Sequence, residues 1–279
     1  MADTLVSTGW LAEHLGAPGV VVLDASKYLP TEPQDAEAEF RTARIPGALR
    51  FDVDAIADPE TELPHMVPAP GRFARLAGAL GIGNDSFVVF YDQKGQASAA
   101  RGWWLMRLFG HENAAVLDGG LPKWLADGNT CESGAPRPVK PAQFRPDFRA
   151  ARLRGIGDML ANLASGTELV LDARSAPRFA AQVAELRLGV RGGHIPGARN
   201  LPYTELLASD QTLLPPDALR ARLAAAGVDG SRPVVTSCGT GVTAAILTLA
   251  MTLAGLPEGA VYDGSWAEWG GRADTPVET

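Results

Sequence analysis

Val234-Val235-Thr236-Ser237-Cys238-Gly239-Thr240-Gly241-Val242-Thr243-Ala244 is the stretch from which the fold can be predicted. Its first four residues predict a short buried strand, and an apolar helix is expected over about 244–253. Between them, Gly239 and Gly241 let the backbone curl so that successive N–H groups point toward the cysteine sulfur. The loop also ends at a helix N-terminus, which favours an anion. We therefore expect Cys238 to ionise readily and to act as a nucleophile.

A cysteine in this position also has a plainer interpretation. Free cysteine is often a small core residue, and Cys238 would then simply end a buried strand. The combination of strand, cysteine, glycine loop and helix favours the catalytic interpretation over this one.

The rest of the chain consists of two halves that carry the same motifs in the same order. Each half has an apolar run ending in aspartate, an Ile-Pro-Gly-Ala turn, a strand followed by a polar loop, and an Asp-Gly pair followed by tryptophan. Such an ordered repeat indicates a tandem duplication. Equivalent landmarks lie 145 to 150 residues apart: Asp24 and Asp172, Ile45 and Ile195, Asp92 and Cys238, Asp118 and Asp263.

Short apolar strands alternate with helical stretches in both halves, so we predict an α/β protein of two domains, each a mainly parallel sheet flanked by helices. The expected boundaries are 1–131 for the first domain, 132–150 for a proline-rich, semi-rigid linker and 151–279 for the second domain. Sites in such sheets form at the carboxyl ends of the strands, where Cys238 is expected to lie.

The two halves differ most at the loop. Where the second half has Cys238, the first half has Asp92. An aspartate cannot take up a transferable group as a thiolate does. We therefore predict one active cysteine per chain, in the second domain.

Composition excludes several classes of function. The chain has 279 residues, a net charge of −7 and a pI near 5.2, which argue against nucleic acid and anionic membranes as partners. Its most apolar stretch, 244–256, is shorter than the roughly 20 residues of a membrane span, and a secretory signal is not expected at the N-terminus. Cys131 and Cys238 lack CxxC spacing, and the four histidines lack ligand spacing. We expect no metal, no structural disulfide and a cytoplasmic location, with Cys131 exposed at the edge of the linker.

The repeated order Asp-Ala, Ile-Pro-Gly-Ala, cysteine loop and Asp-Gly-x-x-x-x-Trp resembles the tandem rhodanese-domain sulfurtransferases over essentially the whole chain. Within that family the loop 238–244 is most similar to the loop of 3-mercaptopyruvate sulfurtransferases, which usually carry serine where Thr240 stands here. Thiosulfate sulfurtransferases typically have basic residues at the two positions after the cysteine, and here these are Gly239 and Thr240. A dianion such as thiosulfate gains much from adjacent cations, so a monoanionic α-keto thiol is the favoured donor.

The resemblance also implies roles for individual residues. Arg178 and Arg187 match the pair that binds the carboxylate and keto oxygen of the donor, a task that suits the guanidinium fork. Asp54 and His65 match residues that the family pairs with the loop hydroxyl, here Thr240, to relay protons. The backbone expected to cradle the substrate sulfur runs through Gly239, Gly241, Val242 and Thr243.

The activity implied is a two-step sulfur transfer without a cofactor. Cys238 takes sulfur from 3-mercaptopyruvate as a persulfide, pyruvate leaves, and a thiol or cyanide then removes the outer sulfur; thioredoxin is an acceptor by resemblance. Thiosulfate:cyanide sulfur transfer is the alternative activity, and a non-catalytic binding or redox-sensing module is a further one. A cysteine-dependent phosphatase would need an arginine closing the loop, where this chain has Ala244.

Overall fold

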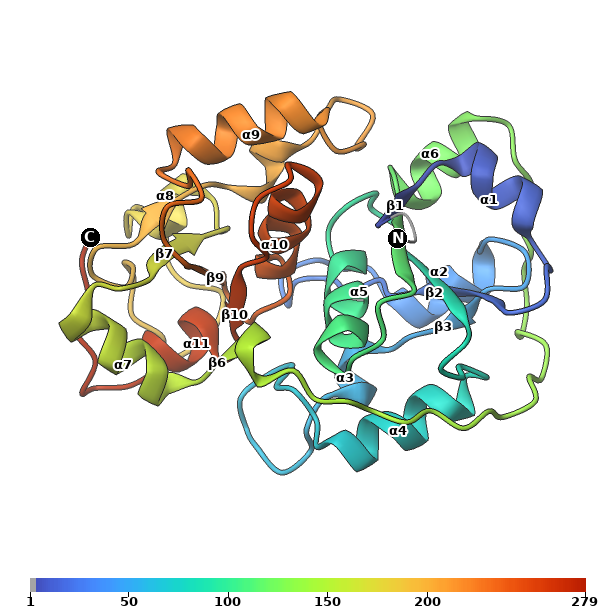
Figure 1. The fold of residues 1–279 in the computed structure, drawn as a ribbon, viewed down its shortest axis with the longest axis horizontal. Coiled ribbons are helices and arrows are strands. Elements are labelled where there is room, and N and C mark those ends of the chain that lie inside the picture. Colours follow the sequence, from blue (N-terminus) through green and yellow to red (C-terminus); the bar gives the residue numbers. More distant parts are fainter. Residues whose placement is uncertain (1–3) are drawn as a thin grey trace. The chain divides into compact units, whose positions relative to one another are not determined.

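A computed structural model describes residues 4–279 and divides them into two compact units (Figure 1). Unit 1 comprises residues 4–58, 67–149 and 208–213, and unit 2 comprises residues 59–66, 150–207 and 214–279. Each half of the sequence thus contributes one short segment to the unit formed mainly by the other half. We call residues 59–66 the first arm and residues 208–213 the second arm. The arms begin 149 residues apart and end 147 residues apart, which is the spacing of the duplicated motifs. The two arms are therefore equivalent segments, and the exchange is reciprocal.

Unit 1 contains a five-stranded parallel sheet with the strand order β1-β5-β4-β2-β3, flanked by helices (Figure 1). Its strands are β1 (Leu5–Val6), β2 (Val20–Asp24), β3 (Leu49–Arg50), β4 (Phe87–Tyr91) and β5 (Ala114–Leu117). Its helices are α1 (Thr8–His14), α2 (Ala36–Thr42), α3 (Val53–Ile56), α4 (Pro70–Ala79), α5 (Ala99–Leu108) and α6 (Gly120–Ala126).

Unit 2 repeats this topology with the strand order β6-β10-β9-β7-β8, again all parallel. Its strands are β6 (Leu153–Arg154), β7 (Leu169–Asp172), β8 (Arg199–Asn200), β9 (Val234–Ser237) and β10 (Ala260–Tyr262). Its helices are η1 (Ala150–Arg152), α7 (Ile156–Ser165), α8 (Ala176–Phe179), η2 (Tyr203–Leu206), α9 (Pro216–Ala225), α10 (Ala244–Leu253) and α11 (Ser265–Trp269). The predicted fold class, two domains with parallel sheets, is confirmed.

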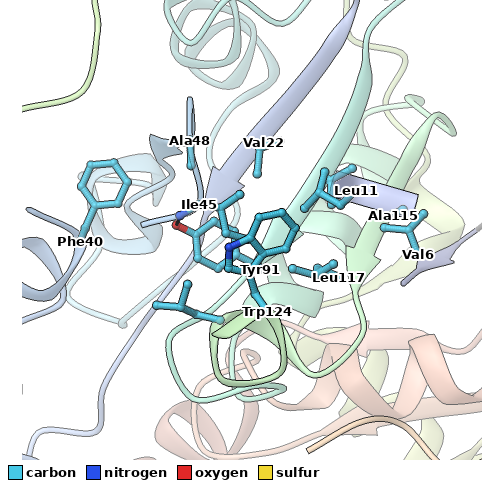
Figure 2. Packing of buried hydrophobic residues seen from close by; sticks show 12 residues of the cluster. Val6, Leu11, Val22, Phe40, Ile45, Ala48, Tyr91, Ala115, Leu117 and Trp124 are labelled. Carbon is cyan, nitrogen blue, oxygen red and sulfur yellow. Dashed lines mark hydrogen bonds between the residues drawn. The ribbon is translucent and has the colours of Figure 1, made fainter. Parts of the chain in front are cut away.

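The core of unit 1 shows how the repeated motifs meet. Tyr91, at the end of β4, lies in a buried cluster with Trp124 of α6 and Ile45 of the Ile-Pro-Gly-Ala turn (Figure 2). The Tyr91 hydroxyl accepts a hydrogen bond of 3.3 Å from the backbone N–H of Ile45. Burying each large apolar side chain stabilises the fold by about 1.5–3 kcal/mol. The motifs that mark the duplication are therefore core-forming positions.

The segment expected to be a linker lies along unit 1. The backbone N–H of Ala142 donates to the carbonyl of Gly78, and that of Asp147 donates to the carbonyl of Phe109. Phe144 is buried, with its ring centroid 5.6 Å from that of Phe73. Cys131, expected to be exposed, is half-buried because it packs against the core of unit 1, and this burial raises the pKa of its thiol.

Candidate active site

Cys238 directly follows β9, the central strand of the unit 2 sheet, and is 2% exposed. The loop after it ends at Ala244, where α10 begins, as the sequence predicts. Residues 244–251 are all buried, because this helix is apolar around its whole circumference. The nucleophile thus lies at the carboxyl edge of the sheet, between a central strand and the N-terminus of a buried helix.

The first turn of α11 binds the backbone carbonyls of Cys238 and of the residue after it. The N–H of Trp266 donates to the carbonyl of Cys238 over 2.9 Å, and the N–H of Ala267 donates to that of Gly239 over 2.8 Å. Tyr262, just before this turn, donates its hydroxyl to Glu268 over 2.8 Å. Burial and the Glu268 carboxylate raise the pKa of Tyr262 far above its usual range, so this hydroxyl stays a donor.

Ser265, the first residue of α11, also contacts the backbone of the cysteine and was not predicted from the sequence. Its hydroxyl accepts the N–H of Cys238 over 3.2 Å and donates to the carbonyl of Tyr262 over 2.8 Å. Its φ angle is 48°, in the left-handed region, which costs an L-residue about 1–2 kcal/mol. The equivalent residue of unit 1 is Gly120, with φ 54°. A serine in place of the repeat's glycine is the signal that marks this position.

The matching loop of unit 1 surrounds a buried carboxylate with backbone N–H groups. Asp92 is fully buried, and one carboxylate oxygen accepts the N–H groups of three consecutive residues, 97–99, each over 2.9 Å. The other oxygen accepts the N–H of Lys94 over 3.0 Å. A strand, a tight loop and a helix N-terminus here surround a negative charge with N–H groups. In unit 2, Cys238 is the residue equivalent to Asp92, directly after the central strand and before the N-terminus of α10.

Arg178, on the short helix α8, reaches the cysteine loop. A Cβ atom built on Gly239 would lie 3.3 Å from its Nη2 atom, so the guanidinium lies directly against this glycine. The same Nη2 donates to the Glu185 carboxylate over 2.5 Å, while Nε is buried and forms no hydrogen bond with residues 4–279. Arg178 therefore keeps N–H donors beside Gly239, the residue after the nucleophile.

Glu185 bridges Arg178 to a second arginine that the sequence reasoning did not single out. Its other oxygen accepts from Arg174 over 2.7 Å, and Arg174 also binds both oxygens of Asp172. The Arg174 guanidinium stacks over the ring of Trp266 at 4.5 Å. This chain of contacts joins α8 to α11, the two elements that border the cysteine loop.

Arg187 lies in the loop after α8 and is half-buried. Among residues 4–279 its side chain forms no ion pair or hydrogen bond, in contrast to Arg178. Its role in substrate binding stays a prediction.

The first arm places His65 at the cysteine loop. Its Nδ1 atom lies 2.9 Å from the Thr240 hydroxyl, and the residue is 7% exposed. Its φ of 62° is left-handed, a strained backbone of the kind that collects at functional sites. Asp54 belongs to unit 1, in the first turn of α3, where its half-exposed carboxylate forms an ion pair with Lys27. The structure thus pairs His65 with Thr240, while the part of Asp54 in the relay stays a prediction.

Residues 4–279 contain no group of three or more His, Cys, Asp and Glu side chains arranged to hold a metal ion. Over the same residues, no helix has both the length and the apolar character that a bilayer crossing needs.

Comparison with known proteins identifies the architecture. The model of the rhodanese-like domain matches twice, at residues 7–127 and 156–272. The chain is 42% identical to the 3-mercaptopyruvate sulfurtransferase of Homo sapiens, over 98% of this chain and 94% of the relative. It is 39% identical to the thiosulfate sulfurtransferase of Bos taurus, over 99% of this chain and 94% of the relative.

A solved structure agrees with these relatives. The crystal structure of SseA from Escherichia coli, described as a 3-mercaptopyruvate sulfotransferase with the rhodanese fold, matches with a TM-score of 0.86 and 38% identity. The match covers 95% of this chain and 99% of that one. The chain therefore belongs to the rhodanese family, as two rhodanese-like domains in tandem of which the second carries the cysteine loop.

Proposed function

We propose that this protein is a sulfurtransferase that takes sulfur from 3-mercaptopyruvate onto Cys238 and passes it to a thiol or to cyanide. The observation that carries the proposal is the cysteine loop: Cys238 stands where the equivalent loop of unit 1 surrounds the Asp92 carboxylate with N–H groups. Such a loop stabilises a thiolate and the terminal sulfur of a persulfide by the same contacts. The relatives that act on 3-mercaptopyruvate or thiosulfate support the same class of reaction.

The first step joins two sulfur atoms. The Cys238 thiolate attacks the sulfur of mercaptopyruvate, the S–S bond forms as the C–S bond breaks, and the electron pair passes to carbon as the enolate of pyruvate. The donor's thiol proton is delivered to this carbon, which yields pyruvate and leaves a persulfide anion on the cysteine. We assign that proton transfer to Thr240 and His65, whose side chains lie 2.9 Å apart.

The donor is bound through its carboxylate. Arg178 lies against Gly239 with N–H groups still available, and Arg187 follows on the next loop. We assign the carboxylate and keto oxygen to these two side chains, since a guanidinium matches a carboxylate in bidentate fashion.

The second step transfers the outer sulfur. A thiolate or cyanide attacks the terminal sulfur, the S–S bond breaks, and Cys238 leaves as thiolate, so that the enzyme returns to its starting state. Thioredoxin is the protein acceptor that we propose.

Thiosulfate is the second candidate donor, favoured by the bovine relative that acts on it. Attack on its outer sulfur releases sulfite and needs no proton, so the same cysteine loop serves both reactions. The uncharged Gly239 and Thr240 support the monoanionic donor over this dianion.

Intact mass measurement tests the proposal. Reduced protein is exposed to a range of concentrations of either donor, with Cys238→Ser as control. We expect a gain of one sulfur at much lower mercaptopyruvate than thiosulfate concentration, and no gain in the control. Equal or better loading from thiosulfate would reverse the donor assignment, and no loading from either donor would refute the enzyme activity.

A further inference from the structure

The arginines and carboxylates beside the cysteine loop form a closed ion-pair cluster. It contains Asp172, Arg174, Arg178 and Glu185. The side chains of Asp172, Arg174 and Glu185 are 3%, 1% and 4% exposed, and that of Arg178 is 17% exposed. Water therefore reaches the cluster mainly at Arg178, the member that lies against Gly239.

The formal charges of this cluster cancel. Two guanidinium groups face two carboxylates, and Glu185 contacts both arginines through different oxygens. The remaining N–H groups of Arg174 donate to the Asp172 carboxylate and to the carbonyl of Gly193. Of the two arginines assigned to the donor, only Arg187 has a charge that is not neutralised by a carboxylate within residues 4–279.

We propose that Glu185 is a specificity-determining residue, which neutralises Arg178 and so limits the binding site to donors with one negative charge. This inference rests on the proposed sulfur transfer and deepens it. Arg178 keeps its N–H groups for hydrogen bonding to a carboxylate but contributes little net charge. A site with one uncompensated arginine matches a monoanion, whereas a dianion such as thiosulfate would remain half-compensated.

A charge role of Glu185 and a mere packing role have different effects on the two donors. Removing the charge of Glu185 leaves one more positive charge beside the loop. That charge attracts a dianion about twice as strongly as a monoanion, because Coulomb energy scales with the product of the charges. We expect the ratio of kcat/KM for thiosulfate to that for mercaptopyruvate to rise about tenfold, which corresponds to about 1.4 kcal/mol.

The test compares Glu185→Gln with a matched control. Glu168→Gln breaks the partly buried ion pair between Glu168 and Arg154. Glu168 directly precedes β7, at the amino end of the strand whose carboxyl end carries Asp172. Both variants add one net positive charge to the chain. The donor ratio is expected to rise in the first variant and to stay at the wild-type value in the second. An equal loss with both donors in Glu185→Gln would overturn the proposal, since Glu185 would then only hold Arg178 in place.

Arg178→Gln supplies a measurement of opposite sign. It leaves the Glu185 charge less compensated, so both rates fall, and the thiosulfate rate falls further. A donor ratio that is unchanged or raised in this variant refutes the charge argument even if Glu185→Gln is too unstable to assay. Failure of the wild-type protein to load sulfur from either donor would instead refute the proposed function.

Discussion

The Asp92 carboxylate should be a main stabiliser of unit 1. In Asp92→Ala, four N–H groups of the loop and of the start of α5 lose their acceptor inside the protein. Each unsatisfied buried donor costs roughly 1–3 kcal/mol, and part of that sum is offset because a buried carboxylate no longer has to be desolvated. We expect the free energy of unfolding to fall by about 4 kcal/mol, close to what removal of a partner from a buried ionic group costs.

The assay is urea unfolding followed by circular dichroism, with hydrogen exchange of peptides that cover residues 93–99. Asp35→Ala is the control, because Asp35 also accepts two backbone N–H groups, at the exposed start of α2, and its loss should cost about 1 kcal/mol. Asp92→Asn keeps one acceptor oxygen and should fall between wild type and Asp92→Ala. If Asp92→Ala costs no more than Asp35→Ala and exchange at 93–99 is unchanged, the view that this loop depends on a bound anion is wrong.

Three further predictions concern other residues. His65→Asn should lower kcat with mercaptopyruvate by about 10²-fold and lower kcat with thiosulfate much less, because only the pyruvate enolate needs a proton. Steady-state kinetics with both donors test this, and equal losses of kcat would contradict the proton relay. Ser265→Ala should cost about 1–3 kcal/mol of stability, because the N–H of Cys238 and the carbonyl of Tyr262 lose their partner. Ser265→Gly should cost less, since it also relieves the left-handed backbone. Urea midpoints compare the two variants, and a glycine variant no more stable than the alanine variant would contradict the backbone strain. Burial lowers the pKa of His111, so the folded protein holds this ring neutral and binds its proton less well than the unfolded chain. The contribution of the neutral His111 ring to stability is therefore complete above the usual histidine pKa of about 6.5 and declines as pH falls below it, by at most about 1.4 kcal/mol per pH unit. His111→Gln should weaken the pH dependence of the urea midpoint between pH 7.5 and 5.5. An unchanged pH dependence in this variant would exclude His111 as its cause.

Local patterns were sufficient to predict the elements that carry the nucleophile. The β-branched run 234–237 and the apolar run 244–253 form β9 and α10 with the expected bounds. Both signals depend on residues adjacent in the chain, and burial of a continuous apolar run follows from its composition. The duplication was visible for a similar reason, because the motifs that repeat are the core positions of each sheet.

The contacts of Arg178 could not be predicted in this way. Its partner Glu185 lies in an irregular loop seven residues away, where no helical or strand period relates side-chain directions. The arginine itself was predicted by resemblance, but its neutralisation by a buried carboxylate appears only once α8 and the loop are folded together. Ser265 was missed because its function depends on a left-handed backbone, which the letters Asp-Gly-Ser-Trp do not reveal without the glycine of the repeat beside them.

The sequence by itself determined the fold class, the duplication and the single cysteine loop, because each rests on residues close together in the chain and on the physics of burying them. The pairing of His65 with Thr240, across 175 positions of sequence, was implied by the resemblance, and the tertiary structure shows it. Only the tertiary structure decided the exchange of the two arms, which places residues 59–66 in unit 2 and residues 208–213 in unit 1. It also decided which charges beside the loop cancel. Such contacts depend on where whole elements come to rest when their apolar faces are buried, and no local periodicity encodes that position.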